Sequence, residues 1–370
     1  MTRILAINGG SSTLKFALFD AETLRREASD RIDVVSAERG GAAEGLIGRI
    51  AARVPLRDLA GVGHRIVHGG LELSEHARIT PELLEKLSDA RPLDPTHLPF
   101  EISLIDAISR VAPGVPQVAC FDSALFRDLP RVAQLLPIPR AYLDRGIRRL
   151  GFHGLSYSYL RGELRRVAGD AAASGRVILA HLGAGASLAA LSGGKPIDTT
   201  MAFTPAAGLV MGTRPGDLDP GLLVHLVRSE KMSADALDAF VNAQCGLRGV
   251  SGTTSDMKEL EARASSDPRA AEAVALFCYQ AAKAIGGFAA ALGGLDTLVF
   301  SGGIGERSAR VRREVCARLE FLNVAIDAAS NEAHAAVIST PSSRVAVRVI
   351  PTDEEIMMAR IVRELLEEDA

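Results

Sequence analysis

Two similar stretches of sequence decide the fold: RILAINGGSSTLKFALFD at residues 3–20 and RVILAHLGAGASLAALSGG at residues 176–194. Each stretch has an apolar run, one polar residue (Asn8 or His181), a turn of glycine and small residues, and a second apolar run. Such runs on either side of a glycine turn predict a pair of β-strands. The two copies lie nearly half the chain apart, which predicts two structurally equivalent halves.

The glycine-rich turns of the two copies also suggest a function. A turn of this kind presents backbone N–H groups with no side chain in the way, and an anionic phosphate binds to such groups. Two facing turns could therefore hold a nucleotide between two lobes. Because short glycine motifs are weak signals, either copy alone is also compatible with an ordinary tight hairpin. The duplication is what favours the nucleotide site.

The composition limits the classes of protein to which the chain can belong. The chain has 370 residues, enough for two domains that each have a core. Hydrophobic residues make up 47% and charged residues 24% of the chain, as in an ordinary soluble globular protein. A net charge of −3 and the lack of a strong basic block argue against nucleic acid as the main partner. We therefore expect basic side chains to function as single residues at specific sites and not as a basic patch.

No sequence feature indicates export or membrane insertion. The N-terminus enters a strand directly, without the basic and apolar segments of a signal peptide. The cysteines are far apart and form no CxxC pair, so neither a zinc site nor a disulfide framework is indicated, and a reduced cytoplasm is expected. The most apolar stretch, residues 271–292, contains Glu272 and Lys283, so we interpret it as a core helix and not as a membrane span.

The rest of the chain alternates predicted strands and helices, as layered α/β domains do. Residues 37–48 are rich in alanine and glycine without a strong period, and we predict a loose connection there. Apolar residues recur at steps of three and four within residues 274–292, which predicts a helix. DTLVFSGGIGE at 296–306 predicts a strand, a glycine turn and a helix N-terminus, a corner suited to an anion. Thr352 and Glu355 predict a capping box before a last helix.

Five polar, glycine-rich motifs are candidates for chemistry: GHRIVHGG at 63–70, CFDSALF at 120–126, GFHGLSY at 151–157, MGTRPGDLDP at 211–220 and SGGIGER at 301–307. They place Arg65 and Arg214 on glycine turns, which suits a substrate with two anionic groups, because guanidinium is always charged and binds carboxylate or phosphate through a fork of donors. An acid (Asp122) and a histidine (His153) nearby would suit phosphoryl transfer.

Each candidate has a structural alternative. Arg65 could belong to a surface turn, His153 could be a structural histidine, and Asp122 could form an Asx turn. Lys15 could equally be a solvated lysine on an edge strand. Asp217 and Asp219 are interpreted as residues that build their turn. The remaining histidines considered are interpreted as structural or exposed: His64, His68, His76 and His225. Taken together, the motifs favour a phosphotransferase.

The motifs HRIVHGG, GFHGLSY, FTPAAGLVMGTRPGDLDP and SGGIGE, in this order over nearly the whole chain, resemble those of the acetate and propionate kinase family, which belongs to the actin-like superfamily. The resemblance implies an α/β fold of two duplicated actin-like (ribonuclease H-like) lobes with a nucleotide cleft between them. The first lobe would contain residues 1–149 and 353–370, so that the C-terminal helix completes it. The second lobe, residues 150–352, would carry most of the nucleotide site.

The resemblance also implies roles for the residues at matching positions. Arg65 and Arg214 would hold the carboxylate and the phosphoryl group, and Arg214 would neutralise charge in the transition state. Asp122 would orient or activate the carboxylate and help to organise magnesium. His153 would donate to the phosphoryl oxygens in flight.

Family positions further imply a metal site and a nucleotide site. Asn8 and Glu354 would position the metal, partly through water. The residues that would line the nucleotide site are Lys15, His181, Leu182, Gly183, Ala184, Gly185, Asp256, Met257, Lys258, Gly303, Ile304, Gly305, Glu306 and Arg307.

The acyl group would lie in a small apolar pocket formed by Val67, Thr96, Phe152 and Pro205. The chain departs from the family pattern here, because LDPTHLP at 93–99 stands where the family reads LAPLHNP, and Thr96 replaces a leucine. A methyl-sized change in such a pocket is worth about 1–3 kcal/mol. An acyl group other than acetate therefore stays an open alternative.

Two further departures affect other parts of the site. The second glycine turn reads HLGAG where the family usually has HLGNG, so Ala184 lacks an amide and the nucleotide preference stays open. GFHGLSY replaces GFHGTSH, so the chain loses a hydroxyl at Leu155 and an imidazole at Tyr157.

The implied reaction is a direct, reversible, in-line transfer in which ATP and a short carboxylate, acetate or propionate, give ADP and an acyl phosphate such as acetyl phosphate. Mg²⁺ is the expected cofactor, with Mn²⁺ as an alternative. A cytoplasmic homodimer is expected, with neither nucleic acid nor a membrane as partner. The alternatives are a kinase for another small carboxylate or with another phosphoryl donor, a non-catalytic actin-like ATP-binding switch, and a phosphatase of the same superfamily.

Overall fold

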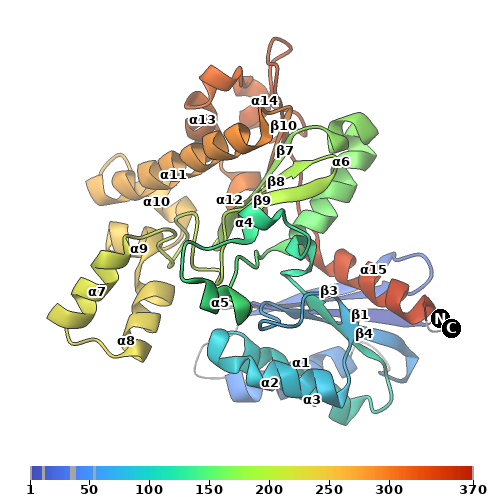
Figure 1. Ribbon diagram of the computed structural model, residues 1–370. Helices are drawn as coiled ribbons and strands as arrows, with labels where there is room; N and C mark the ends of the chain where they lie inside the picture. Colours follow the sequence, from blue (N-terminus) through green and yellow to red (C-terminus); the bar gives the residue numbers. More distant parts are fainter. Residues whose placement is uncertain (1, 11–12, 34–38, 53–55, 369–370) are drawn as a thin grey trace.

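The computed structural model describes residues 2–10, 13–33, 39–52 and 56–368, which form two lobes, each built on its own β-sheet (Figure 1). The first sheet has the order β3-β2-β1-β4-β6-β5. Its strands are β1 Arg3–Gly9, β2 Thr13–Asp20, β3 Arg26–Asp33, β4 Leu59–Ile66, β5 Ala77–Arg78 and β6 Gln117–Phe121. The second sheet has the order β11-β10-β7-β8-β9. Its strands are β7 Val177–Leu182, β8 Ala186–Ser192, β9 Lys195–Thr199, β10 Thr297–Ser301 and β11 Ala346–Val349.

The two sheets repeat one topology. In the first, β1 pairs antiparallel with β2 and parallel with β4, β2 pairs antiparallel with β3, and β4 pairs parallel with β6. In the second, β7, β8, β9, β10 and β11 take the places of β1, β2, β3, β4 and β6 with the same strand directions. The predicted duplication is therefore confirmed, and β5 is an addition at the edge of the first sheet.

Both faces of each central strand are buried, which explains why the two apolar runs are continuous. In β1, Leu5 and Ile7 pack in the cluster that contains α1 and α3, whereas Ile4 and Ala6 face Met358 and neighbouring residues of α15. A parallel strand covered on both faces needs apolar residues at every position. The strand β7 repeats this pattern between α6 on one face and α11 on the other.

Helices cover the first sheet from both sides (Figure 1). Those of the first lobe are α1 Arg39–Ala51, α2 Pro81–Asp89, α3 Leu98–Val111 and the C-terminal α15 Glu354–Glu367, with short 3₁₀ turns at Leu56–Asp58, Arg91–Leu93 and Ala124–Phe126. The helix α15 packs on β1 and β4, although the chain reaches it only after completing the second sheet.

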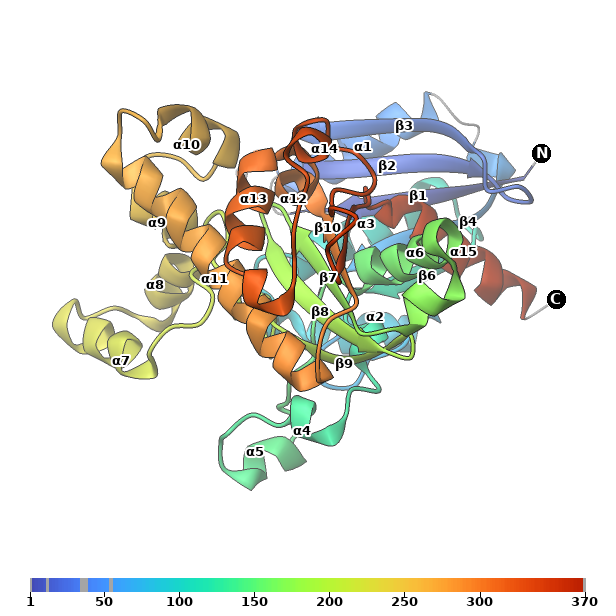
Figure 2. The ribbon, with the colours of Figure 1, turned by 90° about the horizontal axis from the view of Figure 1, so that it is seen from above.

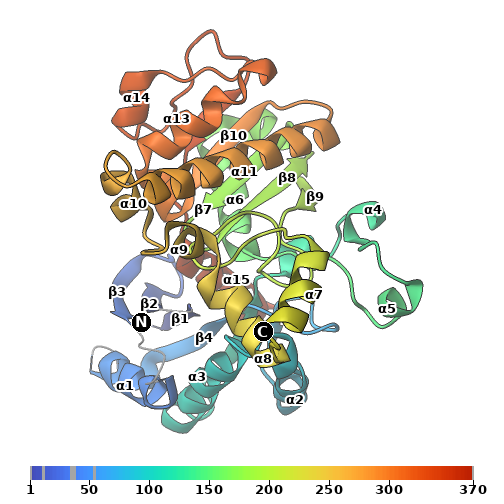
Figure 3. The same ribbon diagram turned by 90° about the vertical axis from the view of Figure 1, so that its left-hand side faces the viewer.

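The second lobe has a larger set of helices. They are α6 Gly154–Ser174, α7 Pro220–Ser229, α8 Ala234–Ala239, α9 Gly246–Ser251, α10 Met257–Arg263, α11 Pro268–Leu292, α12 Gly302–Arg307, α13 Ala309–Ala317 and α14 Ala328–Glu332, with a π turn at Phe240–Gln244 and a 3₁₀ turn at Glu320–Leu322. Figure 3 shows the sheet of the second lobe above the first lobe, with α7 and α8 level with that first lobe. Two short helices, α4 Arg131–Gln134 and α5 Arg140–Asp144, lie on an arm that projects away from both sheets (Figure 2).

The long apolar helix is a core helix, as its spacing predicts. Among the described residues, α11 is the helix whose length and composition would allow it to cross a bilayer. Its residues Val274, Phe277, Ala281 and Ile285 are buried, however, in the cluster that covers the second sheet. The apolar face of α11 is therefore buried inside the second lobe.

Two local predictions are wrong. Residues 37–48, predicted as a loose connection, largely belong to α1, whose Ala43, Ile47 and Ile50 pack on the first sheet, while residues 37 and 38 lie outside the described residues. Steps of four and three residues between these side chains are helical, and the glycines around them hid the pattern. The cap of α15 is Asp353, whose carboxylate accepts from the Ile356 N–H, and not Thr352.

Candidate active site

The candidate residues of the first lobe lie where parallel strands end. Asn8 and Arg65 are near the carboxyl ends of β1 and β4, and Asp122 directly follows β6. These three strands are neighbours and parallel, so their carboxyl ends meet at one edge of the sheet. In open α/β sheets this edge is where ligands bind. Of the first glycine turn, Ser11 and Ser12 lie outside the described residues.

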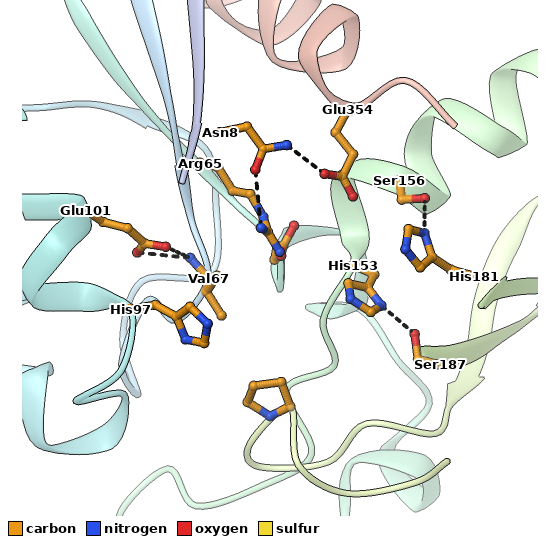
Figure 4. Close-up of polar contacts among 12 residues, drawn as sticks. Asn8, Arg65, Val67, His97, Glu101, His153, Ser156, His181, Ser187 and Glu354 are labelled. Carbon is orange, nitrogen blue, oxygen red and sulfur yellow. Dashed lines mark hydrogen bonds and ion pairs between the residues drawn. The ribbon is translucent and has the colours of Figure 1, made fainter. Parts of the chain in front are cut away.

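A chain of polar contacts connects these three side chains to α15 (Figure 4). Arg65 donates to one Asp122 oxygen, with Nη2 at 2.6 Å and Nε at 3.0 Å, and its Nη1 lies 3.3 Å from Asn8 Oδ1. Asn8 Nδ2 in turn donates to Glu354 at 2.8 Å and to Glu355 at 3.0 Å. Residues from opposite ends of the sequence thus form one cluster.

The charges of this cluster are enclosed. Asp122 is fully buried, and burial raises the pKa of its carboxyl while the Arg65 guanidinium acts against that rise. Burial also opposes the charge of Arg65, but the Asp122 and Glu354 carboxylates outweigh it and raise the Arg65 pKa. Burial raises the pKa of Glu354 as well, yet Arg65 and His181 bring it below its usual value. Arg65 is therefore a permanent cation between two carboxylates.

Two histidines of the second lobe face this cluster (Figure 4). The rings of His153 and His181 are stacked, with centroids 4.4 Å apart and an interplanar angle of 28°. His153 Nδ1 lies 2.9 Å from Ser187 Oγ, and His181 Nδ1 lies 2.8 Å from Ser156 Oγ. Burial, and then the charges of His181 and the two arginines, hold the pKa of His153 well below its usual value. His153 is therefore a neutral imidazole at pH 7.

A close backbone approach places His153 at the site. The N–H of Gly154 donates to the Asp122 carbonyl at 2.8 Å, and a Cβ on Gly154 would lie only 2.2 Å from that oxygen. His153 itself has a left-handed backbone, with φ of 61°, at the start of α6. Glycine is needed at position 154 because any side chain there would push the segment of His153 away from the segment of Asp122.

Arg214 joins the cluster from the loop before α7. Its Nη1 donates to the Pro205 carbonyl at 2.7 Å, and burial followed by the nearby charge of Arg65 lowers its pKa to about 10. The two aspartates after it build the turn, as predicted: Asp217 accepts from the Gly208 N–H and Asp219 from the Gly221 N–H. Arg214 therefore remains charged at neutral pH on a fixed loop.

A cavity of about 300 Å³ opens beside Arg214. Of the four residues predicted for the acyl pocket, Thr96 and Pro205 line this cavity, whereas Val67 and Phe152 are buried and do not line it. The cavity wall also holds Asp94, which the sequence reasoning missed, and whose carboxylate accepts from His97 Nδ1 at 2.9 Å. This aspartate stands in the motif LDPTHLP, so the sequence contained a pattern from which it could have been identified.

The predicted nucleotide residues fall into two groups. One group lines a second cavity, of about 640 Å³, together with Ser255, Glu261, Ser308 and His334: Ala184, Asp256, Met257, Lys258, Gly303, Ile304 and Arg307. The other group does not line it: Lys15, His181, Leu182, Gly183, Gly185, Gly305 and Glu306.

Some residues of the second group contact the polar cluster or connect neighbouring segments. Gly185 lies beside Arg214 and His153. Glu306 accepts from the N–H groups of Gly302, at 2.9 Å, and Thr352, at 3.2 Å, which connects the glycine turn after β10 to the segment before α15. Lys15 is exposed on β2, directly opposite Asn8 in the strand pairing.

The donor set beside Arg65 fits a hard divalent cation. Asp122 Oδ1 is buried and has no hydrogen-bond partner within the described part of the chain, and the Glu354 carboxylate lies in the same cluster. The described residues contain no group of three or more His, Cys, Asp and Glu side chains that could enclose a metal. Mg²⁺ typically binds through one or two carboxylates, waters and substrate phosphates, so this sparse oxygen set suits it.

Comparisons with known proteins agree on one family. The profile of the Acetokinase family matches residues 42–360. The acetate kinase of Rhodopseudomonas palustris (strain ATCC BAA-98 / CGA009) is 42% identical over 97% of this chain and 97% of its own length. Among solved structures, the acetate kinase of Porphyromonas gingivalis superposes with a TM-score of 0.86 at 34% identity, and a propionate kinase of Francisella tularensis with a TM-score of 0.90 at 32% identity. Each covers 99% of this chain and is itself covered in full.

Proposed function

Because this chain belongs to the acetokinase family and is a short-chain carboxylate kinase, we propose that it transfers the γ-phosphoryl group of ATP to acetate or propionate in one reversible, in-line step. A carboxylate oxygen attacks the γ-phosphorus as the bond to the β-bridging oxygen breaks, and ADP leaves. The acceptor is already ionised at neutral pH, so no general base is required. Acetyl phosphate is the expected main product.

The observation that carries this proposal is the convergence of two guanidinium groups, a neutral imidazole and a carboxylate. Arg65 lies against Asp122 at 2.6 Å. A Cβ placed on Gly185 would lie 2.8 Å from Arg214 Nη2 and 3.2 Å from His153 Nε2, so these two groups flank one point. Preset cations and N–H donors of this kind stabilise the charge on a phosphoryl group in transfer.

This arrangement supports the following roles. Arg65, held by Asp122, binds the carboxylate of the acceptor. Arg214 and His153 contact the phosphoryl oxygens, with Arg214 supplying charge and His153 a proton for a hydrogen bond. The space beside Arg214 would hold the acyl group and the 640 Å³ cavity the nucleotide.

We also propose that Mg²⁺, or Mn²⁺ in its place, binds at Asp122, Asn8 and Glu354 through oxygen atoms and water. The unpartnered Asp122 Oδ1 supports this. When bound, the ion would neutralise phosphate charge.

The acyl preference is proposed from the cavity beside Arg214. Its wall carries Thr96, His97 and the Asp94 carboxylate, so it is more polar than the apolar pocket implied by the family pattern. Acetate remains the first choice, because the family match includes acetate kinases and the cavity of about 300 Å³ suits a small acyl group. A carboxylate that carries a polar group is the second candidate, since Asp94 and Thr96 would accept hydrogen bonds from it.

Further proposals concern the whole chain. We propose that residues 1–149 with 353–370 and residues 150–352 are the two domains, which the packing of α15 on β1 and β4 supports. The domains would close on the substrates and exclude water that would otherwise hydrolyse ATP. A cytoplasmic homodimer is proposed from the family.

The proposal is tested by trapping acyl phosphate as hydroxamate, with magnesium-ATP and carboxylates from formate to butyrate, including glycolate. Turnover with acetate or propionate is expected, and the ratio of kcat/KM values measures the effect of Thr96. ADP release without added carboxylate would indicate a phosphatase. ATP binding without turnover on any acceptor would contradict the proposal and favour a switch protein.

A further inference from the structure

The His153 imidazole is the end of a buried chain of hydrogen bonds that the proposed function leaves unexplained. Its Nδ1 lies 2.9 Å from Ser187 Oγ (Figure 4), and the Tyr157 hydroxyl lies 2.6 Å from the same serine oxygen. The exposed fractions of His153, Ser187 and Tyr157 are 8%, 0% and 0%. Buried polar groups must find their partners within the protein, so the three groups have to satisfy one another.

The fold brings these three residues together from distant parts of the sequence. The register of β7 and β8 places Ser187 directly opposite His181, so the two side chains share one face of the sheet. His153 stacks on His181 from above that face. Tyr157 follows His153 by one turn of α6, with its N–H donating to the His153 carbonyl, and therefore points in the same direction.

The direction of the hydrogen bonds follows from counting donors and acceptors. The Tyr157 hydroxyl has one proton, and Ser187 Oγ is its hydrogen-bond partner among the side chains described. If Tyr157 donates to Ser187, then Ser187 donates its own proton to His153 Nδ1. In the reverse direction the phenol proton would be buried without an acceptor, at a cost of about 1–3 kcal/mol. The forward direction leaves Nδ1 as an acceptor and the ring proton on Nε2.

We propose that Ser187 and Tyr157 are positioning residues that hold His153 as the neutral Nε2–H tautomer, so that its proton faces the phosphoryl group beside Arg214. This inference rests on the proposed role of His153 in phosphoryl transfer. Nε2 is the ring atom that borders Gly185 and the Arg214 guanidinium, whereas Nδ1 faces the second lobe's sheet. The opposite tautomer would present a lone pair to phosphate oxygens, which carry lone pairs themselves.

The electrostatic surroundings agree with a neutral ring and a neutral phenol. Burial and neighbouring positive charge lower the pKa of His153 well below its usual value. Burial raises the pKa of Tyr157, and hydrogen bonding with Ser187 and with the His181 backbone offsets that rise only in part. Both groups therefore keep their protons in place at neutral pH, and the chain works as an orienting device without net proton transfer.

The first test reads the tautomer directly and does not require activity. The full-length protein is labelled with ¹⁵N-histidine, and long-range ¹H–¹⁵N correlation spectra distinguish Nε2–H from Nδ1–H rings. The resonance that disappears in His153→Gln belongs to His153. The expected result is the Nε2–H form in the unmodified chain and a mixture in Ser187→Ala. An Nδ1–H or doubly protonated ring in the unmodified chain would overturn the proposal.

The second test separates turnover from binding. Ser187→Ala is expected to lower kcat by about 10- to 100-fold, as for groups that orient a catalytic or ligating imidazole, with KM for ATP and acetate unchanged within about twofold. Tyr157→Phe should lower kcat by a smaller factor, because Ser187 can then rotate either way. Ser187→Thr keeps the hydroxyl and should restore kcat.

Matched controls remove a hydroxyl of the same type elsewhere. Ser103→Ala on α3 and Tyr159→Phe on α6 are expected to leave kcat unchanged, because their side chains lie outside the site. Unchanged kcat in Ser187→Ala, or an effect on KM alone, would contradict the proposal. If Ser187→Ala does not fold, the proposal is still tested by the His153 tautomer in the unmodified chain and by the kcat of Tyr157→Phe. A chain that shows the Nε2–H ring but no kinase activity would refute the proposed function and leave the hydrogen-bond chain standing.

Discussion

At the scale of single residues, Arg214 shows how the site is prepared for an anion. Its guanidinium is largely enclosed, keeps its charge with a pKa of about 10, and forms one hydrogen bond, to the Pro205 carbonyl, and no ion pair within the described part of the chain. An enclosed cation without a carboxylate partner costs stability in the free protein. This cost agrees with the proposed role of Arg214 in binding an anionic substrate.

Arg214→Ala should consequently separate function from stability. We expect kcat to fall by about 10²- to 10³-fold, the usual cost of losing one preset donor to developing charge. The thermal midpoint should stay the same or rise slightly. The hydroxamate assay and a thermal melt measure both quantities. Arg228→Ala, an exposed arginine on α7, is the control and should change neither. Normal turnover in Arg214→Ala would remove this residue from the mechanism.

Gly185 is the residue at which two functional groups leave no room for a side chain. A Cβ there would lie 2.8 Å from Arg214 Nη2 and 3.2 Å from His153 Nε2. Gly185→Ala should therefore displace both groups by a fraction of an ångström to about 1 Å and lower kcat by about 10²-fold. Gly287→Ala on α11, where a Cβ meets no atom within 4 Å, should leave kcat unchanged. Equal kcat values for the two variants would show that catalysis does not require the absence of a side chain at position 185.

The residues that sequence reasoning identified and those it missed differ in kind. Arg65, Asp122, His153 and Arg214 stand in short, distinctive motifs of the sequence, so local sequence could indicate them as candidates. Ser187 lies among apolar residues of β8, and its proposed role depends on a histidine 34 residues away in the sequence. The sequence around Ser187 contains no pattern that indicates such a contact.

Other residues near the acyl cavity show the same limit. Glu101 was missed because it lies inside a helix, yet both of its carboxylate oxygens accept from the Val67 N–H at 3.2 Å. Burial, and then the charge of Asp94, raise its pKa well above the usual value. Val67 and Phe152 were predicted as walls from the family pattern, but side-chain packing, which sequence alone does not fix, keeps them behind the cavity surface.

At the scale of secondary-structure elements, the start of α15 joins local stability to the site. Asp353 caps the helix by accepting from the Ile356 N–H at 3.1 Å and also pairs with Arg26 of β3. The next two residues, Glu354 and Glu355, are the partners of Asn8. The cap therefore fixes the helical turn that presents the carboxylates.

Asp353→Ala should lower the free energy of unfolding by about 1 kcal/mol, the usual value of an N-cap, and also weaken the response of activity to Mg²⁺. Urea unfolding and the magnesium dependence of kcat measure the two effects. Asp353→Asn keeps the capping oxygen and should retain most of the stability. If Asn is as destabilising as Ala, the pair with Arg26 and not the cap is responsible.

Elements with strong periodicity or turn signals could be predicted, and weakly patterned ones could not. The two hairpins, the core helix α11 and the strand-turn-helix unit at β10 and α12 appear where the sequence indicates them. The helix α1 was missed because its glycines conceal a stripe of only three described buried residues, Ala43, Ile47 and Ile50. Tertiary packing on the sheet stabilises this helix despite its composition.

At the scale of the whole molecule, the repeated strand order explains why one site can use residues from all parts of the chain. Both sheets present the carboxyl ends of three adjacent parallel strands, so one lobe supplies Arg65 and Asp122 and the other supplies His181, while His153 comes from the start of α6. The internal repeat predicted this duplication. The edge strand β5 and the arm of α4 and α5 belong to one copy only, so the repeat could not reveal them.

A second property of the whole molecule is a set of enclosed histidines that are neutral when folded: His64, His68, His76, His153 and His181. In each, burial is the main cause of a lowered pKa. The unfolded chain protonates them near pH 6.5, whereas the native state does so only at lower pH. Protons therefore favour the unfolded state below about pH 6.5, and acid should destabilise the protein.

His64 allows this property to be tested away from the site. It is buried on β4, its Nε2 donates to Gln117 Oε1 at 2.7 Å, and burial lowers its pKa to about 4. From pH 7 to pH 5 this residue alone should reduce the free energy of unfolding by about 2 kcal/mol, since protonation of the unfolded state begins near pH 6.5. In His64→Gln the loss of stability between these pH values should be smaller by that amount. Urea unfolding at both pH values, with the exposed His225→Gln as control, measures the difference. Equal losses in the unmodified chain and in His64→Gln would mean that His64 is not the neutral group inferred from its burial.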